Sequence, residues 1–311
     1  MMILGEPVIL GGGNGIACVL IISTDPGARV TCNFGNTEIS KTANADGKAV
    51  FELKKAGVWT VTASLDGETV SKEIDTSLAL ETEIDFINAD PVLENNSWET
   101  ISKVAKKGEA QNYWNIGDTK KVTINGVTYE TQIIDFDHND VTDPTSYGRE
   151  KAGITFQMKN SLNPGRNIHG TGTMTGGWAS LYIRTNGIPE IITQLETELQ
   201  DVLLNVETPY GATYNATSLS YVSDKLFLPS EWEVFGYKSF ASLQEGNQFA
   251  YYAAGNSRVK TIGDGGGANL WYTRSYFAQY PGYFCTVDQS GNPGYIAPNT
   301  NGRGVSLCFC V

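Results

Sequence analysis

Short stretches in which apolar and polar residues alternate dominate the first third of the chain. The alternation is clearest at Trp59, Val61 and Ala63, which are separated by threonines, and this is the period of a strand with one buried face. Asp-Gly pairs at 46–47 and 66–67 supply turns between such stretches. The pattern predicts a small antiparallel sandwich with five or more strands, at 16–24, 28–33, 49–54, 57–64 and 68–74.

After residue 85 the apolar residues recur at helical spacing. A helix is predicted to begin at Ser97 and Trp98 and to end near Gly108, and Asn125-Gly126 predicts a hairpin within 120–136. A second helix is predicted from Pro189 onward, with Ile191, Ile192, Leu195, Leu199, Val202 and Leu203 on one face. We therefore expect two domains, an all-β domain at 1–88 and an α+β domain at 89–311, and we expect residues 1–85 to fold independently.

Composition narrows the classes of function. The chain has 311 residues with a formal net charge of −12, and both proposed domains are acidic, which argues against a nucleic-acid partner. No segment approaches the roughly 20 apolar residues of a membrane span, so no membrane insertion is expected. The apolar run at 16–23 is too short for a signal peptide, which favours synthesis in the cytoplasm.

The five cysteines show no metal-binding spacing and fit reduced, mostly buried thiols. Pairing of Cys18 with Cys32 stays open, although two small core residues are the simpler interpretation.

The best candidate for catalysis or metal binding is an acidic segment after the predicted hairpin. It contains Asp135, Asp137, His138, Asp140 and Asp143, which are ligand types for a hard metal ion. Asp and Asn are also typical of the turn that ends a strand, and the segment lacks the closing glutamate of a calcium loop. We therefore interpret it as a solvated loop. With no nucleophile elbow and no phosphate loop, the expectation is no catalytic residue, no cofactor and no metal required for folding.

The last 42 residues, 270–311, have an unusual composition. They contain nine aromatic residues and only three charged ones, among many glycines and asparagines. Tyrosine, serine, glycine and asparagine are the residues from which antibody binding sites are built. We expect the tyrosines between Arg274 and Phe284 to be exposed. The residues expected to be buried are Trp271, Phe284, Val287, Val305, Leu307 and Phe309.

Several motifs occur in order along residues 95–311. They are YWNIGD (113–118), VTINGVTYETQIIDFDHND (122–140), ITFQMKN (154–160), GGW (176–178), SDKLFLPSEWEVFG (223–236), YYAAGNSRVK (251–260), LWYTRS (270–275) and GVSLCFCV (304–311). Together they resemble a C-type-lectin-fold domain of bacterial and phage proteins, a fold shared by formylglycine-generating enzymes and by the variable proteins of diversity-generating retroelements. Residues 26–77 resemble immunoglobulin-like or carboxypeptidase-regulatory-like modules, which act mainly as spacers.

The resemblance implies that the terminal hairpin, about 268–311, is a variable ligand-binding face. Adenine-directed mutagenesis of AAC-type codons cannot produce Lys, Glu or Met, and none of these occurs in residues 270–311. A buried, glycine-rich hairpin would also be poor in Lys and Glu. The calcium-dependent sugar motifs Glu-Pro-Asn and Trp-Asn-Asp are missing, as is a cysteine pair for oxidase chemistry. The ligand-binding residues implied are Tyr272, Tyr276, Phe277, Tyr280, Tyr283, Thr286, Tyr295, Ala297, Asn299, Asn301 and Arg303.

The function expected from this resemblance is that of a binding protein, not an enzyme. We expect an adhesin on a phage tail or capsid surface, made in the bacterial cytoplasm, that binds a host-cell surface protein or glycan and contacts other virion proteins. Two alternatives stay open: an enzyme of the formylglycine-generating or metal-dependent type, and a structural virion decoration protein without a specific ligand.

Overall fold

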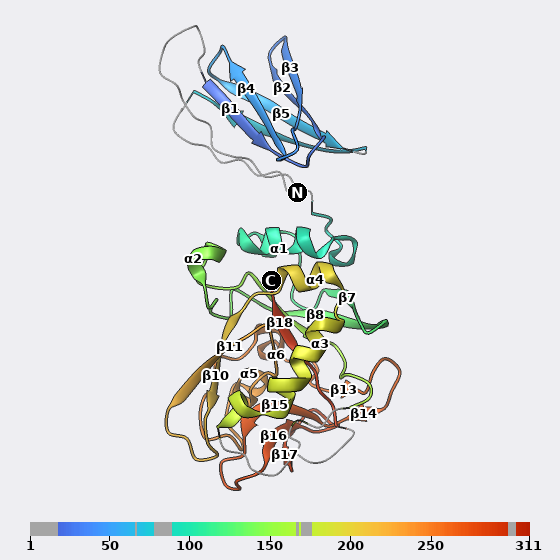
Figure 1. Cartoon of the computed structure of the whole chain (residues 1–311), viewed down its shortest axis with the longest axis vertical. Coiled ribbons are helices and arrows are strands. Elements are labelled where there is room, and N and C mark those ends of the chain that lie inside the picture. The colour runs from blue at the N-terminus through green and yellow to red at the C-terminus, as the bar shows by residue number, and fades with distance from the viewer. Residues whose placement is uncertain (1–17, 66, 78–88, 166–167, 169–175, 298–302) are drawn as a thin grey trace. The chain divides into compact units, whose positions relative to one another are not determined.

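A computed structural model describes residues 18–65, 67–77, 89–165, 168, 176–297 and 303–311. The chain divides into two compact units, Met1–Ala89 and Asp90–Val311. Strands dominate both units, and the few helices are short (Figure 1). The chain is therefore a β-rich protein of more than one domain.

The first unit contains six antiparallel strands in two sheets. Strand β1 pairs with β4, and the other sheet has the order β3-β2-β5-β6. Alternate residues of β4 and β5 point into a core that both sheets share, as the sequence pattern predicts. The bounds are β1 (Cys18–Ser23), β2 (Arg29–Phe34), β3 (Thr37–Thr42), β4 (Lys48–Leu53), β5 (Val58–Leu65) and β6 (Glu68–Asp75).

Strand β3 was not predicted from the sequence. It lies at the edge of its sheet, where only β2 pairs with it, and most of its side chains are exposed. Ile39 is its one residue packed against the core cluster. An edge strand of this kind needs little apolar sequence, so the alternation that marks the other strands is absent.

A five-stranded sheet with the order β12-β18-β9-β8-β7 forms the centre of the second unit. The predicted hairpin is confirmed, because β7 and β8 join through Asn125 and Gly126, which both have positive φ. Trp98 packs against Phe156 and Phe309, whose rings lie 5.2 Å apart on neighbouring strands. The bounds are β7 (Thr119–Ile124), β8 (Val127–Phe136), β9 (Ile154–Met158), β12 (Leu226–Phe227) and β18 (Cys308–Cys310).

The first predicted helix is confirmed as α1 (Trp98–Lys106). The Ser97 side chain accepts a hydrogen bond from the backbone N–H of Thr100, and Trp98, Ile101, Val104 and Ala105 are buried. The second was predicted as one helix but is two, α3 (Ile188–Gln194) and α4 (Thr197–Val202). Leu195 and Glu196 are extended between them, because Leu195 bridges to Ile124 and the Glu196 carboxylate accepts a hydrogen bond from Trp98 Nε1 at 2.7 Å.

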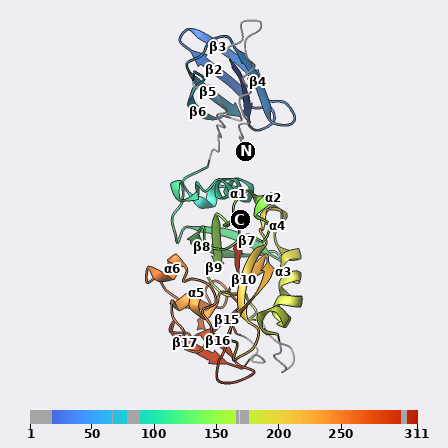
Figure 2. The same cartoon turned by 90° about the vertical axis from the view of Figure 1, so that its left-hand side faces the viewer.

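The remaining strands form small separate sheets. Views from two perpendicular sides place β15, β16 and β17 at the end of the second unit opposite α1 (Figures 1 and 2). None of the described helices is long and apolar enough to span a bilayer. The bounds are β10 (Val206–Gly211), β11 (Leu219–Asp224), β13 (Lys260–Thr261), β14 (Ala268–Asn269), β15 (Trp271–Tyr276), β16 (Phe284–Val287), β17 (Pro293–Ile296), α2 (Pro144–Tyr147), α5 (Glu231–Phe235) and α6 (Ala250–Ala253).

Candidate functional site

The C-terminal segment was predicted to be one hairpin, and this is wrong. Residues 271–296 form the three-stranded sheet β15-β16-β17, and the chain then returns to the five-stranded sheet as β18. Trp271, Phe284, Val287, Val305, Leu307 and Phe309 are all buried, as predicted.

Strand β15 buries two tyrosines, Tyr272 and Tyr276, that were predicted to belong to the ligand-binding face. Tyr272 and Tyr276 are 0% and 3% exposed, and Phe277, which follows the strand, is 3% exposed. The reason is that β15 contacts α5 and β10, and its backbone bonds to further segments through Tyr272 N to Gly304 O and Arg274 N to Pro229 O. Burial raises the pKa of Tyr272 and of Tyr276 to about 12.

Thr286 of β16, the middle strand of this sheet, is also fully buried. Ala297 and Arg303 are partly buried, and the Ala297 carbonyl accepts a hydrogen bond from the Tyr272 hydroxyl at 3.4 Å. Asn299 and Asn301 lie outside the described residues.

Three of the predicted tyrosines are exposed and lie together. Tyr280, Tyr283 and Tyr295 are 55%, 38% and 46% exposed. Tyr295 stacks on the buried Phe277 ring at 4.3 Å, and Phe240 meets both rings edge-on at 5.0 and 5.5 Å. We call these five residues, Phe240, Phe277, Tyr280, Tyr283 and Tyr295, the aromatic surface.

The turn between β15 and β16 holds the aromatic surface in place. The backbone N–H of Phe277 donates to the Tyr283 carbonyl at 3.0 Å, and the N–H of Tyr283 donates to the Tyr280 carbonyl at 3.3 Å. The N–H of Ala278 donates to the Phe240 carbonyl at 2.8 Å, which joins the turn to the loop after α5. The exposed rings therefore stand on a hydrogen-bonded backbone.

A buried carboxylate shapes that loop from beneath. Glu231 is fully buried, and its carboxylate accepts hydrogen bonds from the backbone N–H groups of Ser239, Phe240 and Ala241 at 2.8 to 3.1 Å. Burial raises the pKa of Glu231, and these three hydrogen bonds act in the opposite direction. Glu231 thus fixes the position of Phe240 without contacting solvent.

A second buried network lies next to Glu231. The Arg274 guanidinium forms a two-bonded pair with the Glu233 carboxylate at 2.6 and 2.7 Å, and both side chains are about 1% exposed. Ser230 and Glu233 form a capping box at the start of α5. Burial raises the pKa of Glu245, while Arg274 and the Ser275 hydroxyl, which donates to it, lower that pKa.

This supporting role was not predicted from the sequence. Glu231, Glu233 and Arg274 belong to the motifs SDKLFLPSEWEVFG and LWYTRS, which suggested a family but no role for their charges. The signal in the sequence that could have predicted it is a charged residue inside an otherwise apolar run. Such a residue is buried only when it has a partner of opposite charge or hydrogen-bond partners.

The acidic segment, which begins with Asp135 near the end of β8, consists of separately partnered residues. Asp135 pairs with His138, Asp137 with Arg149 and Asp140 with Lys151 at 2.6 to 2.7 Å, and Asp143 caps α2. Within the described ranges, no three His, Cys, Asp or Glu side chains come together as metal ligands. His169 lies outside the described residues.

The five cysteines are all buried and unpaired, including Cys18 and Cys32. Burial raises the pKa of Cys285 and Cys308 well above its usual value, and raises those of Cys32 and Cys310 to about 12. These thiols are therefore protonated at neutral pH and poorly suited to nucleophilic chemistry.

One family matches the part of the chain that carries the aromatic surface. Residues 153–311 match a family described as a domain of unknown function, DUF6273. No curated protein and no solved structure matches the chain. The match covers just over half of the sequence and includes α5, β15 and every residue of the aromatic surface. The chain therefore belongs to the DUF6273 family.

Proposed function

We propose that the protein is a ligand-binding protein whose contact face is the aromatic surface. The observation that carries this proposal is the grouping of Tyr280, Tyr283 and Tyr295 around the buried Phe277 ring. Aromatic side chains held in place by packing lose little entropy on binding, and a few of them generally supply most of the affinity of an interface.

In the same proposal, the second unit has the C-type-lectin fold of a retroelement variable protein, and the first is an immunoglobulin-like spacer. Two of the motifs that carry the resemblance lie together, because Glu233 of α5 pairs with Arg274 of β15. The lack of Lys, Glu and Met in residues 270–311 supports diversification by adenine replacement. The biological role that fits is attachment of a phage particle to a host-cell surface protein or glycan.

A cell-binding assay tests the contact face. The fluorescently labelled full chain is incubated with a panel of bacterial cells, and bound label is measured by flow cytometry. The variant Tyr280→Ser/Tyr295→Ser should lose at least about 90% of the binding, since each ring is a candidate hot spot. The matched control is Tyr182→Ser/Tyr237→Ser, which removes two equally exposed tyrosines, 53% and 52%, outside the aromatic surface. Equal binding by both variants would favour the structural decoration role.

The diversification part has a separate test in the surrounding DNA. A neighbouring reverse transcriptase gene, with a near-copy of the segment encoding residues 270–311 that differs only at adenines, is the expected arrangement. Differences between the near-copy and the coding segment that are spread over all four bases would contradict diversification by adenine replacement.

A further inference from the structure

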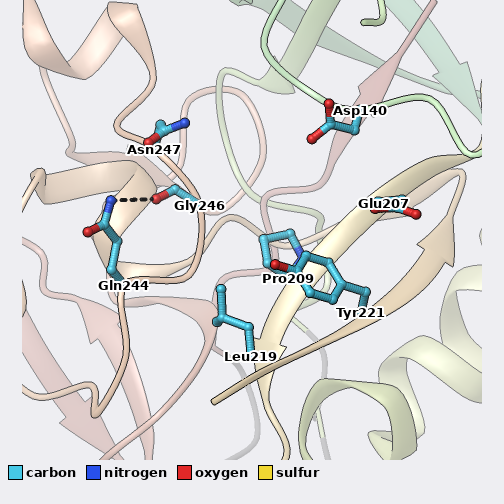
Figure 3. Close-up of a pocket in the computed structure, with 8 residues that line it drawn as sticks. All are labelled: Asp140, Glu207, Pro209, Leu219, Tyr221, Gln244, Gly246 and Asn247. Carbon is cyan, nitrogen blue, oxygen red and sulfur yellow. Dashed lines mark hydrogen bonds between the residues drawn. The ribbon is translucent and has the colours of Figure 1, made fainter. Parts of the chain in front are cut away.

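A pocket of about 390 Å³ lies elsewhere on the second unit. It shares no residue with the aromatic surface. Gln244, Gly246 and Asn247 of one loop face the β10–β11 hairpin across it, and Asp140 stands beside both (Figure 3). The residues that line it are Asp140, Glu207, Pro209, Leu219, Tyr221, Gln244, Gly246 and Asn247.

The hairpin wall follows from strand alternation. In β10, Val206, Thr208 and Tyr210 are buried, so Glu207 and Pro209 point to the opposite face. Pro209 pairs across the hairpin with Tyr221. The outer face therefore presents a carboxylate beside a proline and a tyrosine ring that is 57% exposed.

The two walls are tied together by the buried network. Arg274 Nε donates to the Pro209 carbonyl at 2.8 Å, and Arg274 Nη2 donates to the Glu245 carbonyl at 3.1 Å. The Glu245 carboxylate accepts from the backbone N–H of Gly211 at 2.6 Å. One guanidinium thus positions both sides of the pocket, so the pocket is formed before a ligand arrives.

Close packing fixes the loop wall as well. Gly246 has φ of +98°, and a Cβ built there would lie 2.6 Å from Glu233 Oε1. Only glycine fits this approach of the loop to the buried carboxylate.

Of the residues that the structure describes, the pocket is lined by two carboxylates, Asp140 and Glu207, and by no lysine, arginine or histidine. Asp140 is paired with Lys151, whereas the Glu207 carboxylate has no hydrogen-bond or ion-pair partner within the described part of the chain. The protein as a whole carries a net charge of −12, which attracts cations.

We propose that this pocket binds a protonated guanidinium or ammonium group on an aliphatic stem, as in an arginine or lysine side chain of a partner polypeptide. Glu207 would accept hydrogen bonds from the cation, and the ring of Tyr221 would contact its face. Pro209 and Leu219 provide the apolar wall against which a methylene stem packs.

Nuclear magnetic resonance titration of the full chain tests this proposal with two probes of nearly equal shape. Nα-acetyl-arginine N-methylamide carries the guanidinium, and Nα-acetyl-citrulline N-methylamide carries a neutral urea in its place. We expect the arginine probe to shift the amide resonances of Glu207, Tyr221 and Asn247, and to bind more weakly as salt is raised. The citrulline probe should bind about tenfold more weakly or not at all.

Two variants and one control assign the effect to the pocket. Glu207→Gln keeps the shape and removes the charge, and should weaken the arginine probe about tenfold. Tyr221→Leu should weaken it about threefold. Asp201→Asn removes an exposed carboxylate on α4, outside the pocket, and should leave binding unchanged.

Three results would overturn the proposal. They are equal binding of the two probes, unchanged arginine binding by a folded Glu207→Gln variant, and tighter binding of a neutral saccharide such as glucose than of the arginine probe. Because the pocket and the aromatic surface have no residue in common, the fate of the proposed function does not decide this test.

Discussion

The two units fill their interiors with different kinds of side chain. Among the described residues of the first unit, no charged side chain is buried, and its core cluster is apolar apart from two thiols. The second unit buries Arg274, Glu231, Glu233, Glu245 and Lys260.

The difference follows from how each unit positions its backbone. In the first unit most of the backbone lies in regular strands, which pair with one another. In the second unit long loops must be fixed, and buried charges do this by bonding to N–H and C=O groups of these loops and of the neighbouring strand β10. The loops that carry the aromatic surface and the pocket therefore depend on charges that contact no solvent.

The largest effect is expected from removing the central charge of the second unit. Arg274→Met leaves Glu233 without its partner in a dry site, which should lower the free energy of unfolding by about 3 to 5 kcal/mol. Urea unfolding with hydrogen-exchange mass spectrometry of peptides from each unit measures this, and protection should be lost only in the second unit. Arg29→Ala at an exposed position of β2 in the first unit is the control, with a change within about 0.5 kcal/mol. Similar small losses in both variants would remove the distinction between the two interiors.

Truncating a core side chain of the first unit should lower stability only through the loss of apolar contacts. Ile22 is fully buried in the core cluster, and Ile22→Ala should lower the free energy of unfolding by about 2 to 5 kcal/mol. The loss should be the same at pH 6 and at pH 8, measured by urea unfolding, because no carboxylate, lysine or histidine contributes to that cluster. A loss that changes strongly with pH would mean that charges also stabilise this unit.

The next largest effect is a pH dependence confined to the second unit. Lys260 Nζ donates to the Met158 carbonyl at 2.7 Å and lies 5.4 Å from the Trp271 ring centre, and burial lowers the pKa of Lys260 to about 7. Its pKa in the unfolded chain is higher, so the unfolded state binds more protons above pH 7 and stability should rise with pH. Between pH 7 and 8.5 the gain should be at most about 1.4 kcal/mol per pH unit.

The control for this slope is Lys260→Met, which should flatten it. The pH range ends at 8.5 because cysteines begin to ionise in the unfolded chain above it, whereas the buried thiols, whose pKa values are raised, stay protonated in the folded protein. This difference lowers stability as the pH rises and therefore opposes the effect of Lys260. A slope that persists in Lys260→Met would assign the pH dependence to another group.

The smallest effect is expected from truncating an exposed tyrosine of the terminal segment, with a buried tyrosine of the same segment as the comparison. Tyr280→Ala should change the free energy of unfolding by no more than about 0.5 kcal/mol, because the ring is mostly exposed. Tyr272→Ala, only eight positions earlier, should cost about 3 kcal/mol or more as a core truncation. Thermal melts of the two variants measure both values, and equal losses would mean that the aromatic surface is part of the core.

Some elements could be predicted because residues within the element itself determine its structure. The alternation at Trp59, Val61 and Ala63, the capping by Ser97 and the turn at Asn125 and Gly126 are all of this kind. The break between α3 and α4 was not predictable in this way, because it depends on Trp98 and Ile124, which are distant in sequence.

The candidate site shows the same limit. Composition predicted that Tyr280 and Tyr283 are exposed, the resemblance added Tyr295, and all three are exposed. It could not separate them from Tyr272 and Tyr276, since tyrosine suits both a core and a contact face. A tyrosine of this segment is buried where α5 and β10 cover its strand and exposed elsewhere. The residues of α5 and β10 lie outside the segment, so its own composition cannot predict the difference.

The position of β18 has a consequence for how the protein is made. Cys308–Cys310 pairs with β12 on one side and β9 on the other, in the middle of the sheet. During synthesis, the sheet of the second unit cannot be completed until β18 leaves the ribosome. Until then β9 and β12 each have an unpaired edge, and unpaired strand edges promote aggregation. A messenger RNA that is truncated before the codon for residue 308 yields a sheet without β18. The last strand thus makes proper folding conditional on translation having read through the tyrosine-rich segment before it.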